Sequence, residues 1–270
     1  MTMELYEDQF ADDHDYSVQT ATEKTLIIAS TVRSGSHMLG HALHQTDAFG
    51  FPLEYANTNN LHHWKKKFGL TDTHAVMREL MRRRTSPNGV FGIKLHYSHL
   101  QTLGGFASVR ALFPNPHFVF LSREDVMSQA VSLAVARQTG AWISKQQAQQ
   151  QPVYRFDDID DGLRRILFEN SSWKYTLSAS GAAYMDLRFE DVKSDTAHAI
   201  TRIAQLMKVT VESERIPSAP VTKKQSDTTN QQWTRRFISE FNQNDELMRF
   251  NRESPLRRVK KRLLRRRTAK

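Results

Sequence analysis

Short apolar runs alternate with amphipathic stretches along most of this 270-residue chain. Three of the runs, at residues 26–29, 90–95 and 117–121, are rich in β-branched and aromatic residues and are bounded by turn formers, which is typical of buried strands. A fourth strand is predicted over residues 183–188. Amphipathic helices are predicted between these strands. The alternation predicts an α/β fold in which helices flank a central, mainly parallel sheet on both faces.

The spacing of apolar positions places the connecting helices. The first begins just after residue 35, and residues 47–60 are expected to form a loop rich in turn formers. The three arginines at 82–84 are expected to form a solvated helix end. The other helices are predicted over residues 73–84, 98–112, 125–138, 160–179 and 193–208, with irregular segments at 146–151 and 214–230.

Charge divides the chain into three parts. Residues 1–23 carry seven acidic groups and no Lys or Arg, whereas residues 257–270 carry nine Lys or Arg and no acid. The net charge of +9 therefore belongs to the tail, and the rest of the chain need not bind nucleic acid. We expect an acidic N-terminal lead-in over 1–23, a single domain over 24–250 and a basic tail over 251–270.

The basic tail carries Leu256, Val259, Leu263 and Leu264 at helical spacing among its cations. Such a stretch suits an acidic membrane surface or a nucleic acid, and a solvated end is the alternative that we favour. No apolar run approaches the roughly 20 residues that span a bilayer. The chain has no cysteine, which excludes disulfides and thiolate chemistry and indicates a cytoplasmic protein, or one peripheral to a membrane.

The turn between the first predicted strand and helix reads TVRSGSH at residues 31–37. Backbone N–H groups at such a turn point toward one spot, where the helix dipole attracts an anion. Arg33 adds a positive charge with a donor fork that suits phosphate or sulfate. The ATP-binding form GxxxxGK[ST] is absent, because no glycine precedes Gly35 at the required spacing and no Lys-Ser/Thr follows it. An ordinary tight turn is the alternative for this stretch alone.

Two further cations follow predicted strands in the same way. Lys94 lies at the end of the strand over 90–95, and Arg123 follows the strand over 117–121. In parallel sheets, ligands bind at the carboxyl ends of the strands. Three cations that converge on that edge, Arg33 included, are far more specific for an anionic ligand than any one of them.

Four segments together resemble a known family: TVRSGSHML at 31–39, NGVFGIKLH at 88–96, FVFLSREDVMSQAVS at 118–132 and KKQSDTTNQQWTRRF at 223–237. They are similar to sulfotransferases that use 3′-phosphoadenosine-5′-phosphosulfate (PAPS), most of all to the bacterial trehalose 2-sulfotransferase family. The resemblance implies a P-loop-like sulfotransferase fold, a homodimer, and transfer of a sulfuryl group from PAPS to a hydroxyl of a carbohydrate or glycolipid-like acceptor.

The resemblance also implies two anion sites, because PAPS carries a 5′-phosphosulfate and a separate 3′-phosphate. The turn that begins at Arg33 matches the family's 5′-phosphosulfate loop, in which Arg33 would stabilise charge on the bridging oxygen as its bond to sulfur breaks. Backbone N–H groups of Ser34, Gly35, Ser36 and His37 would bind the anion, and Ser36 would add its hydroxyl. His37 departs from the family, where Ser or Thr is usual.

The 3′-phosphate would lie at the start of the helix predicted from residue 125. Arg123 matches the family's residue there, and either Ser128 or Ser132, one helical turn apart, matches the contacting serine. Three residues of the last motif would close over the nucleotide, with a lysine in place of the family's arginine and a tryptophan that stacks on adenine or belongs to the core: Lys224, Gln225 and Trp233.

Two residues match a general base, which removes the acceptor's proton as sulfur is attacked in line. Glu54, in GFPLEY, matches the glutamate proposed as base in the trehalose enzymes. His96 and Lys94 match the Lys-x-His of animal cytosolic sulfotransferases, where the histidine is the base. Family proximity favours Glu54, with His96 as the alternative and Lys94 as a further catalytic residue.

A substrate-lining loop is expected over residues 52–64, because Tyr55, Asn57 and Trp64 suit a sugar's apolar face and polar rim. No metal is expected, because sulfuryl transfer carries less negative charge than the phosphoryl transfer that relies on Mg²⁺. Two rival functions are an ATP-dependent P-loop-like kinase and a non-catalytic protein that binds nucleotides or nucleic acid. The missing P-loop lysine argues against the first, and only the basic tail supports the second.

Overall fold

The computed structural model describes residues 7–142, 146–217 and 228–244. The chain divides into two compact units, Met1–Thr234 and Arg235–Lys270, and the strands and all but the last helix belong to the first. The second unit contains the end of α10 (Thr228–Asn244), where Arg236 pairs with Glu240 at 2.8 Å. The predicted tail over 251–270 and the predicted boundary at 250 lie outside the described residues.

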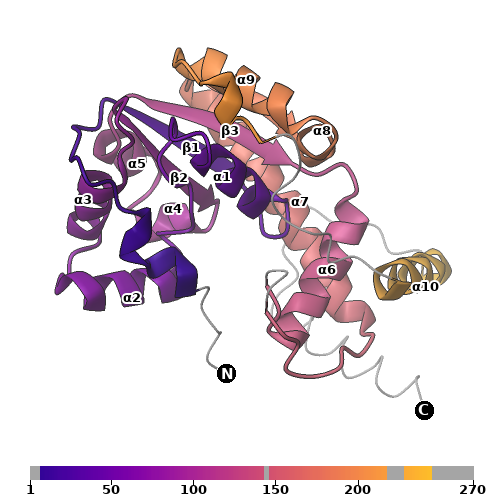
Figure 1. Ribbon diagram of the computed structural model, residues 1–270. Coiled ribbons are helices and arrows are strands. Elements are labelled where there is room, and N and C mark those ends of the chain that lie inside the picture. Colours follow the sequence, from indigo (N-terminus) through magenta and orange to yellow (C-terminus); the bar gives the residue numbers. More distant parts are fainter. Residues whose placement is uncertain (1–6, 143–145, 218–227, 245–270) are drawn as a thin grey trace. The chain divides into compact units, whose positions relative to one another are not determined.

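A four-stranded parallel sheet forms the centre of the first unit (Figure 1). The strands are β1 (Lys24–Ser30), β2 (Val90–His96), β3 (Pro116–Ser122) and β4 (Tyr184–Arg188), in the order β2-β1-β3-β4. Every pairing between them is parallel, so the predicted α/β class is confirmed. Because β1 has β2 on one side and β3 on the other, the connection reverses direction at β1, and such a switch point is where ligands bind.

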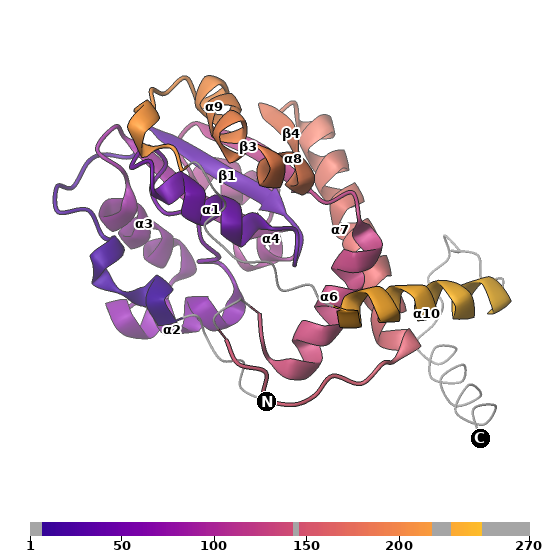
Figure 2. The ribbon, with the colours of Figure 1, turned by 45° about the vertical axis from the view of Figure 1, so that its right-hand side comes forward.

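The two faces of the sheet carry separate parts of the core, since successive side chains of a strand point to opposite faces. Leu26 and Ile28 pack with residues of α1 (Ser36–His44) and α9 (Thr196–Met207), which lie on one face (Figure 2). Ile27 and Ala29 pack on the other face. The helices that contribute to that face are α2 (Thr58–Phe68), α3 (Thr73–Arg84), α4 (His99–Thr102), α5 (Phe106–Leu112) and α7 (Phe156–Ser180).

Two of the predicted helices are divided in the structure. The predicted helix over 98–112 is divided into α4 and α5 at Gly104 and Gly105, which both have positive φ. The predicted helix over 193–208 is divided at Asp195, whose side chain caps α9. The other elements are α6 (Val126–Thr139), which packs beside α7, α8 (Phe189–Ser194), η1 (Glu7–Phe10), η2 (Asp12–His14) and η3 (Ser213–Arg215).

The end of α3 differs from the solvated helix end expected at residues 82–84. Arg84 is fully buried, with 0% of its surface exposed. Its Nε lies 3.0 Å from Oδ1 of Asp15, and its Nη1 donates to the carbonyl oxygen of Gln9 at 2.9 Å. A buried guanidinium needs such partners for its charge and its donors. The acidic N-terminal segment supplies them, which nothing in the local sequence of α3 indicates.

No helix in the described part of the chain is long and apolar enough to cross a membrane.

Candidate active site

The loop between β1 and α1 has the backbone of an anion site. Arg33 and Gly35 have positive φ, of 60° and 86°. A Cβ atom on Gly35 would lie 2.1 Å from a ring carbon of Phe189, so only glycine fits this position. Gly35 has no side chain with which to cap α1, and the first N–H groups of a helix have no partner within the helix, so this turn suits an anion. The buried hydroxyl of Ser34 also has no hydrogen-bond partner in the described part of the chain.

Arg33 brings a fixed positive charge to this loop. Its Nε donates to Oγ of Ser132 at 2.9 Å, and its Nη1 donates to the carbonyl oxygen of Trp142. Burial, together with the charge of Arg123, lowers the pKa of Arg33 to about 10, so the guanidinium stays protonated at neutral pH. Ser132, one of the two serines that the resemblance associates with the 3′-phosphate, thus contacts Arg33 in this structure.

Arg123 follows β3 and approaches the same loop. Its Nη1 donates to the carbonyl oxygen of Arg33 at 3.4 Å, and its guanidinium lies 5.1 Å from the ring centre of Phe189. Burial lowers its pKa. The neighbouring Asp125 caps α6 by accepting a hydrogen bond from the backbone N–H of Ser128 at 2.9 Å. The two arginines therefore meet at the switch point between β1 and β3, as their places after predicted strands indicated.

Gln129 holds the loop to α6. It is fully buried, and its Nε2 donates to Oγ1 of Thr31 at 2.9 Å and to the carbonyl oxygen of Val32 at 2.6 Å. Sequence reasoning missed this residue. Its only local signal is a polar side chain at an apolar position of a helix, and its partners lie about a hundred residues away.

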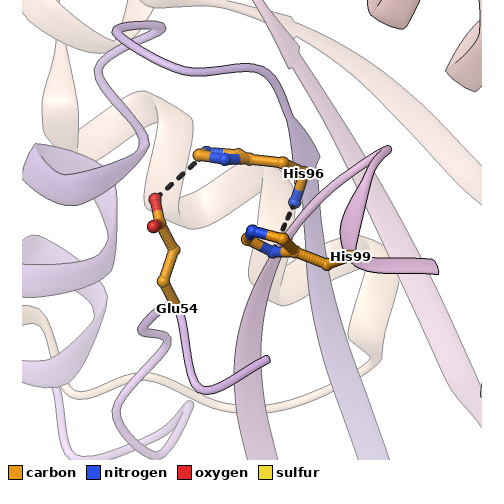
Figure 3. Close-up of side chains that lie close together, drawn as sticks. All are labelled: Glu54, His96 and His99. Carbon is orange, nitrogen blue, oxygen red and sulfur yellow. Dashed lines mark hydrogen bonds and ion pairs between the residues drawn. The ribbon is translucent and has the colours of Figure 1, made fainter. Parts of the chain in front are cut away.

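A second cluster centres on Glu54 (Figure 3). Its Oε1 lies 2.9 Å from Nζ of Lys94 and 3.1 Å from Nε2 of His96. Leu53 brings Glu54 to β2, because it forms a parallel bridge with Ile93 and its carbonyl oxygen accepts a hydrogen bond from the backbone N–H of Lys94 at 2.9 Å. The two residues that the sequence offers as general base are therefore in contact.

The charges around Glu54 keep it ionised. Burial alone would raise the pKa of this carboxyl, but His96 and Lys94 outweigh that effect and hold the pKa well below its ordinary value. Glu54 is thus a carboxylate at neutral pH. Nε2 of His96 is buried and, although it is close to Glu54, it makes no aligned hydrogen bond within the described part of the chain.

His99 completes this cluster and was missed by sequence reasoning. Its Nδ1 accepts a hydrogen bond from the backbone N–H of His96 at 3.2 Å, and the two rings stack with centres 4.8 Å apart. Burial, together with His96, lowers the pKa of His99 to about 3, so the ring is neutral at neutral pH. Because Nδ1 accepts, Nε2 carries the proton.

The donor atoms of Glu54, His96 and His99 lie within 4.8 Å of one another, which raises the question of a metal site. Ligands of a tetrahedral zinc ion are roughly 3.3 Å apart, given bond lengths near 2.0–2.1 Å. Here the two imidazole planes are stacked at 28°, so their in-plane lone pairs do not converge, and the ammonium of Lys94 lies on the carboxylate oxygen. This arrangement does not fit a zinc ion.

His37 lies in the first turn of α1, directly after the loop of residues 31–35 (the anion loop), where the charges of both Arg33 and Lys94 act on it. It is the second residue of α1, and its ring packs on His41 with centres 4.4 Å apart. Burial lowers the pKa of His37 to about 2, and the charges of Lys94 and Arg33 act in the same direction. The last residues of β1 and β2, Ser30 and His96, are paired in the sheet. The anion loop and the Glu54 cluster therefore lie at the same edge of the sheet.

The predicted substrate-lining loop over 52–64 is wrong in its second half, because α2 begins at Thr58. Asn57 caps this helix by accepting from the backbone N–H of Asn59. Tyr55 and Trp64 are buried in the core, so neither side chain presents a surface on which a sugar stacks.

Trp233 is also buried, and its ring meets that of Tyr154 edge-on, with centres 5.7 Å apart. This contact is compatible with both roles considered for Trp233, stacking on adenine and packing in the core. The two other residues expected to close over the nucleotide, Lys224 and Gln225, lie outside the described residues.

Comparison with known proteins identifies the family. Residues 25–240 match the Stf0 sulphotransferase family. The trehalose 2-sulfotransferase of Mycobacterium tuberculosis (strain ATCC 35801 / TMC 107 / Erdman) is 24% identical over 254 residues, covering 79% of this chain and 94% of the relative.

Two solved structures also resemble this chain at low identity. The sulfotransferase domain from the curacin biosynthetic pathway is 12% identical with a TM-score of 0.47, covering 91% of this chain and 98% of that one. The sulfotransferase from Alicyclobacillus acidocaldarius is 13% identical with a TM-score of 0.47, covering 82% and 92%. On the match over most of its length, the chain belongs to the Stf0 sulphotransferase family and is a sulfotransferase.

Proposed function

We propose that this sulfotransferase takes its sulfuryl group from PAPS and transfers it in line to a hydroxyl of a carbohydrate or glycolipid-like acceptor. The observation that carries the proposal is the pairing of two clusters at one edge of the sheet. A cationic loop follows β1, and an ionised carboxylate lies beside the end of β2, at the same edge of the sheet. In-line transfer needs an anion site for the donor and a base for the acceptor.

Arg33 and the N–H groups of residues 34–37 are proposed to bind the 5′-phosphosulfate. The uncapped start of α1 and the conformation of Gly35 support this role. Arg123 is proposed to bind the 3′-phosphate with Ser128 or Ser132. Lys224, Gln225 and Trp233 are proposed to close over the nucleotide, in line with the motif that they share with PAPS-dependent enzymes.

Glu54 is proposed to accept the proton of the attacking hydroxyl. The acceptor oxygen forms a bond to sulfur while the bond from sulfur to the bridging phosphate oxygen breaks, and Arg33 and Lys94 stabilise the negative charge that develops on that oxygen. His96 is the alternative base, supported by its 3.1 Å contact with Glu54. The acceptor class is proposed from the relative's name, trehalose 2-sulfotransferase. Residues 50–70 depart from the family's pattern, so the proposed acceptor need not be trehalose itself.

The test is a transfer assay with PAPS labelled in the sulfuryl group and a panel of saccharides and glycolipids, run with EDTA present. We expect label on a carbohydrate hydroxyl, no transfer from ATP labelled in its γ-phosphoryl group, and a rise in melting temperature with PAP but not with ATP. Phosphoryl transfer from ATP, or a failure of PAP to stabilise the protein, would contradict the donor assignment.

A further inference from the structure

The backbone of Glu54 is held from α2 by a buried side chain. Nδ2 of Asn60 donates to the carbonyl oxygen of Glu54 at 2.9 Å, and only 6% of Asn60 is exposed. The backbone N–H of Asn57 donates to the same carbonyl oxygen at 3.3 Å. Glu54 lies in an irregular segment between α1 and α2, so these bonds and the bridge of Leu53 to β2 fix its position.

Asn60 is in turn held by the N-terminal segment of residues 9–15. Its Nδ2 also donates to Oε1 of Gln9 at 3.2 Å, and Nε2 of Gln9 donates back to Oδ1 of Asn60 at 3.4 Å. Gln9 is 4% exposed. A buried pair of amides that exchange hydrogen bonds allows little change in the position of either partner, because each lost bond leaves a buried polar group unsatisfied.

Arg84 joins this segment to the residue next to Glu54. Its Nη1 donates to the carbonyl oxygen of Gln9 at 2.9 Å and to the hydroxyl of Tyr55 at 3.3 Å. Its Nη2 donates to the carbonyl oxygen of Ala11 at 3.0 Å. The indigo N-terminal segment lies beside α2 in both ribbon views, which agrees with these contacts (Figures 1 and 2).

We propose that the N-terminal segment of residues 9–15 is a positioning element of the acceptor side of the active site, and that it acts on Glu54 through Asn60. The segment precedes the region that matches the family, residues 25–240, and thus adds to the site from outside it. The inference rests on the proposed function, in which Glu54 is the base. Asn60 itself is a positioning residue, since it contacts the backbone of Glu54 and not the reacting atoms.

The geometry around Glu54 explains why its position matters. Its Oε1 lies 2.9 Å from Lys94 and 3.1 Å from His96, so a displacement of about an ångström would break both contacts. A base displaced by that distance also loses its alignment with the acceptor hydroxyl, at a cost of up to about a hundredfold in rate.

The test is Asn60→Leu, with Asn59→Leu as the matched control, because Asn59 is the exposed neighbour on the same helix. We expect Asn60→Leu to lower kcat about tenfold to a hundredfold, while the KM for PAPS and the thermal shift with PAP stay unchanged. The acid limb of the pH profile should move to higher pH, because Glu54 would lie farther from Lys94 and His96. Asn59→Leu should leave all of these values unchanged.

Two further variants keep the test valid if Asn60→Leu fails to fold. They are Gln9→Leu alone and the double variant that combines Gln9→Leu with Asn60→Leu. Gln9→Leu should lower kcat in the same direction, and the double variant should be no slower than Asn60→Leu alone, since both changes break one connection. Full kcat in Asn60→Leu, or a loss of turnover that is matched by a loss of PAP binding, would overturn the inference. Full turnover in Glu54→Gln would instead overturn the proposed base.

Discussion

The anion loop after β1 and the Glu54 cluster beside β2 are neighbours at one sheet edge, but they are built in different ways. The loop is a run of consecutive residues, 31–35, in which Arg33 and Gly35 have positive φ and which Gln129 of α6 holds at its start. The Glu54 cluster brings together an irregular segment, the end of β2 and the start of α4, and it is supported from α2, α3 and η1. The loop therefore takes its residues from one run of the chain, although α6 holds it in place, whereas the residues of the Glu54 cluster themselves come from separate segments.

The two regions also differ in charge. Arg33 and Arg123 give the loop an excess of positive charge, which attracts an anionic donor. In the second cluster Lys94 balances the carboxylate of Glu54. The charge of the loop therefore suits an anionic ligand, and under the proposed function the cluster would hold a base next to a neutral acceptor.

Loss of the loop's cation should have the largest effect. We expect Arg33→Ala to lower kcat with PAPS by about 10²-fold to 10³-fold, because it removes the charge that faces the developing negative charge on the bridging oxygen. The variant should still fold, because Arg33 is partly exposed, although the loss of its hydrogen bonds to Ser132 and Trp142 should lower the melting temperature modestly. Arg78→Ala, an exposed arginine of α3 with a surface partner, is the control and should keep wild-type turnover. Wild-type turnover in Arg33→Ala would remove this residue from the mechanism.

Steady-state kinetics can show which of the two candidate bases, Glu54 or His96, contributes more to kcat. Glu54→Gln should lower kcat by about 10²-fold or more, because the amide cannot accept the proton, and His96→Asn should be less damaging. Binding of PAP, followed by thermal shift, should be the same in both variants because the anion loop is intact. A larger loss in His96→Asn would assign the base to His96, with Glu54 as the group that orients it.

The pH dependence of kcat/KM tests how far Lys94 lowers the pKa of Glu54. The pKa of Glu54 lies below its ordinary value of 4.5, so the active carboxylate is present above that pKa and lost as pH falls through it. Lys94→Met removes one of the charges that lower it, and the acid limb of kcat/KM should move to higher pH. Lys66→Met, on the exposed face of α2, should leave the profile unchanged. An unchanged acid limb in Lys94→Met would mean that another group sets it.

The smallest effect concerns the stability of the loop. Gly35→Ala places a methyl group against Phe189 and also strains a backbone with φ of 86°, so the free energy of unfolding should fall by about 1–3 kcal/mol. Gly181→Ala is the matched control, because it also has positive φ but has open space around it. Denaturant unfolding of both variants measures the difference. Equal losses would show that Phe189 moves aside without cost.

Much of the fold follows from local patterns. The buried runs that became β1, β2 and β3 are short and β-branched or aromatic, and the places of Arg33, Lys94 and Arg123 after or at the ends of these strands bring them to one edge. The predictions failed where a distant partner overrides the local pattern. Arg84 ends an amphipathic helix as a solvated arginine would, yet it is buried by a segment about seventy residues away.

The missed residues have different physical reasons. Gln129 is a polar side chain at an apolar position, and its hydrogen bond to Thr31 forms only when α6 packs against the loop after β1. His99 accepts from His96, only three residues away, but periodicity does not indicate that the turn between β2 and α4 brings this ring back to the end of the strand. Asn60 was assigned to a loop because turn formers surround it, whereas the cap at Asn57 starts a helix there. The periodicity of hydrophobic residues predicts which face of a helix or strand is buried. It does not predict which buried polar groups form hydrogen bonds with one another.

The sequence by itself therefore determined the parallel α/β class and the family, and it predicted the glycine-dependent turn after β1, because strands, helices and turns depend largely on neighbouring residues. It also named both possible bases. Only the tertiary structure decided that Glu54 and His96 are in contact, that Lys94 holds the carboxylate ionised, and that residues 9–15 support it. Those are interactions of charges and buried hydrogen bonds, whose energies depend on distances that the fold alone sets.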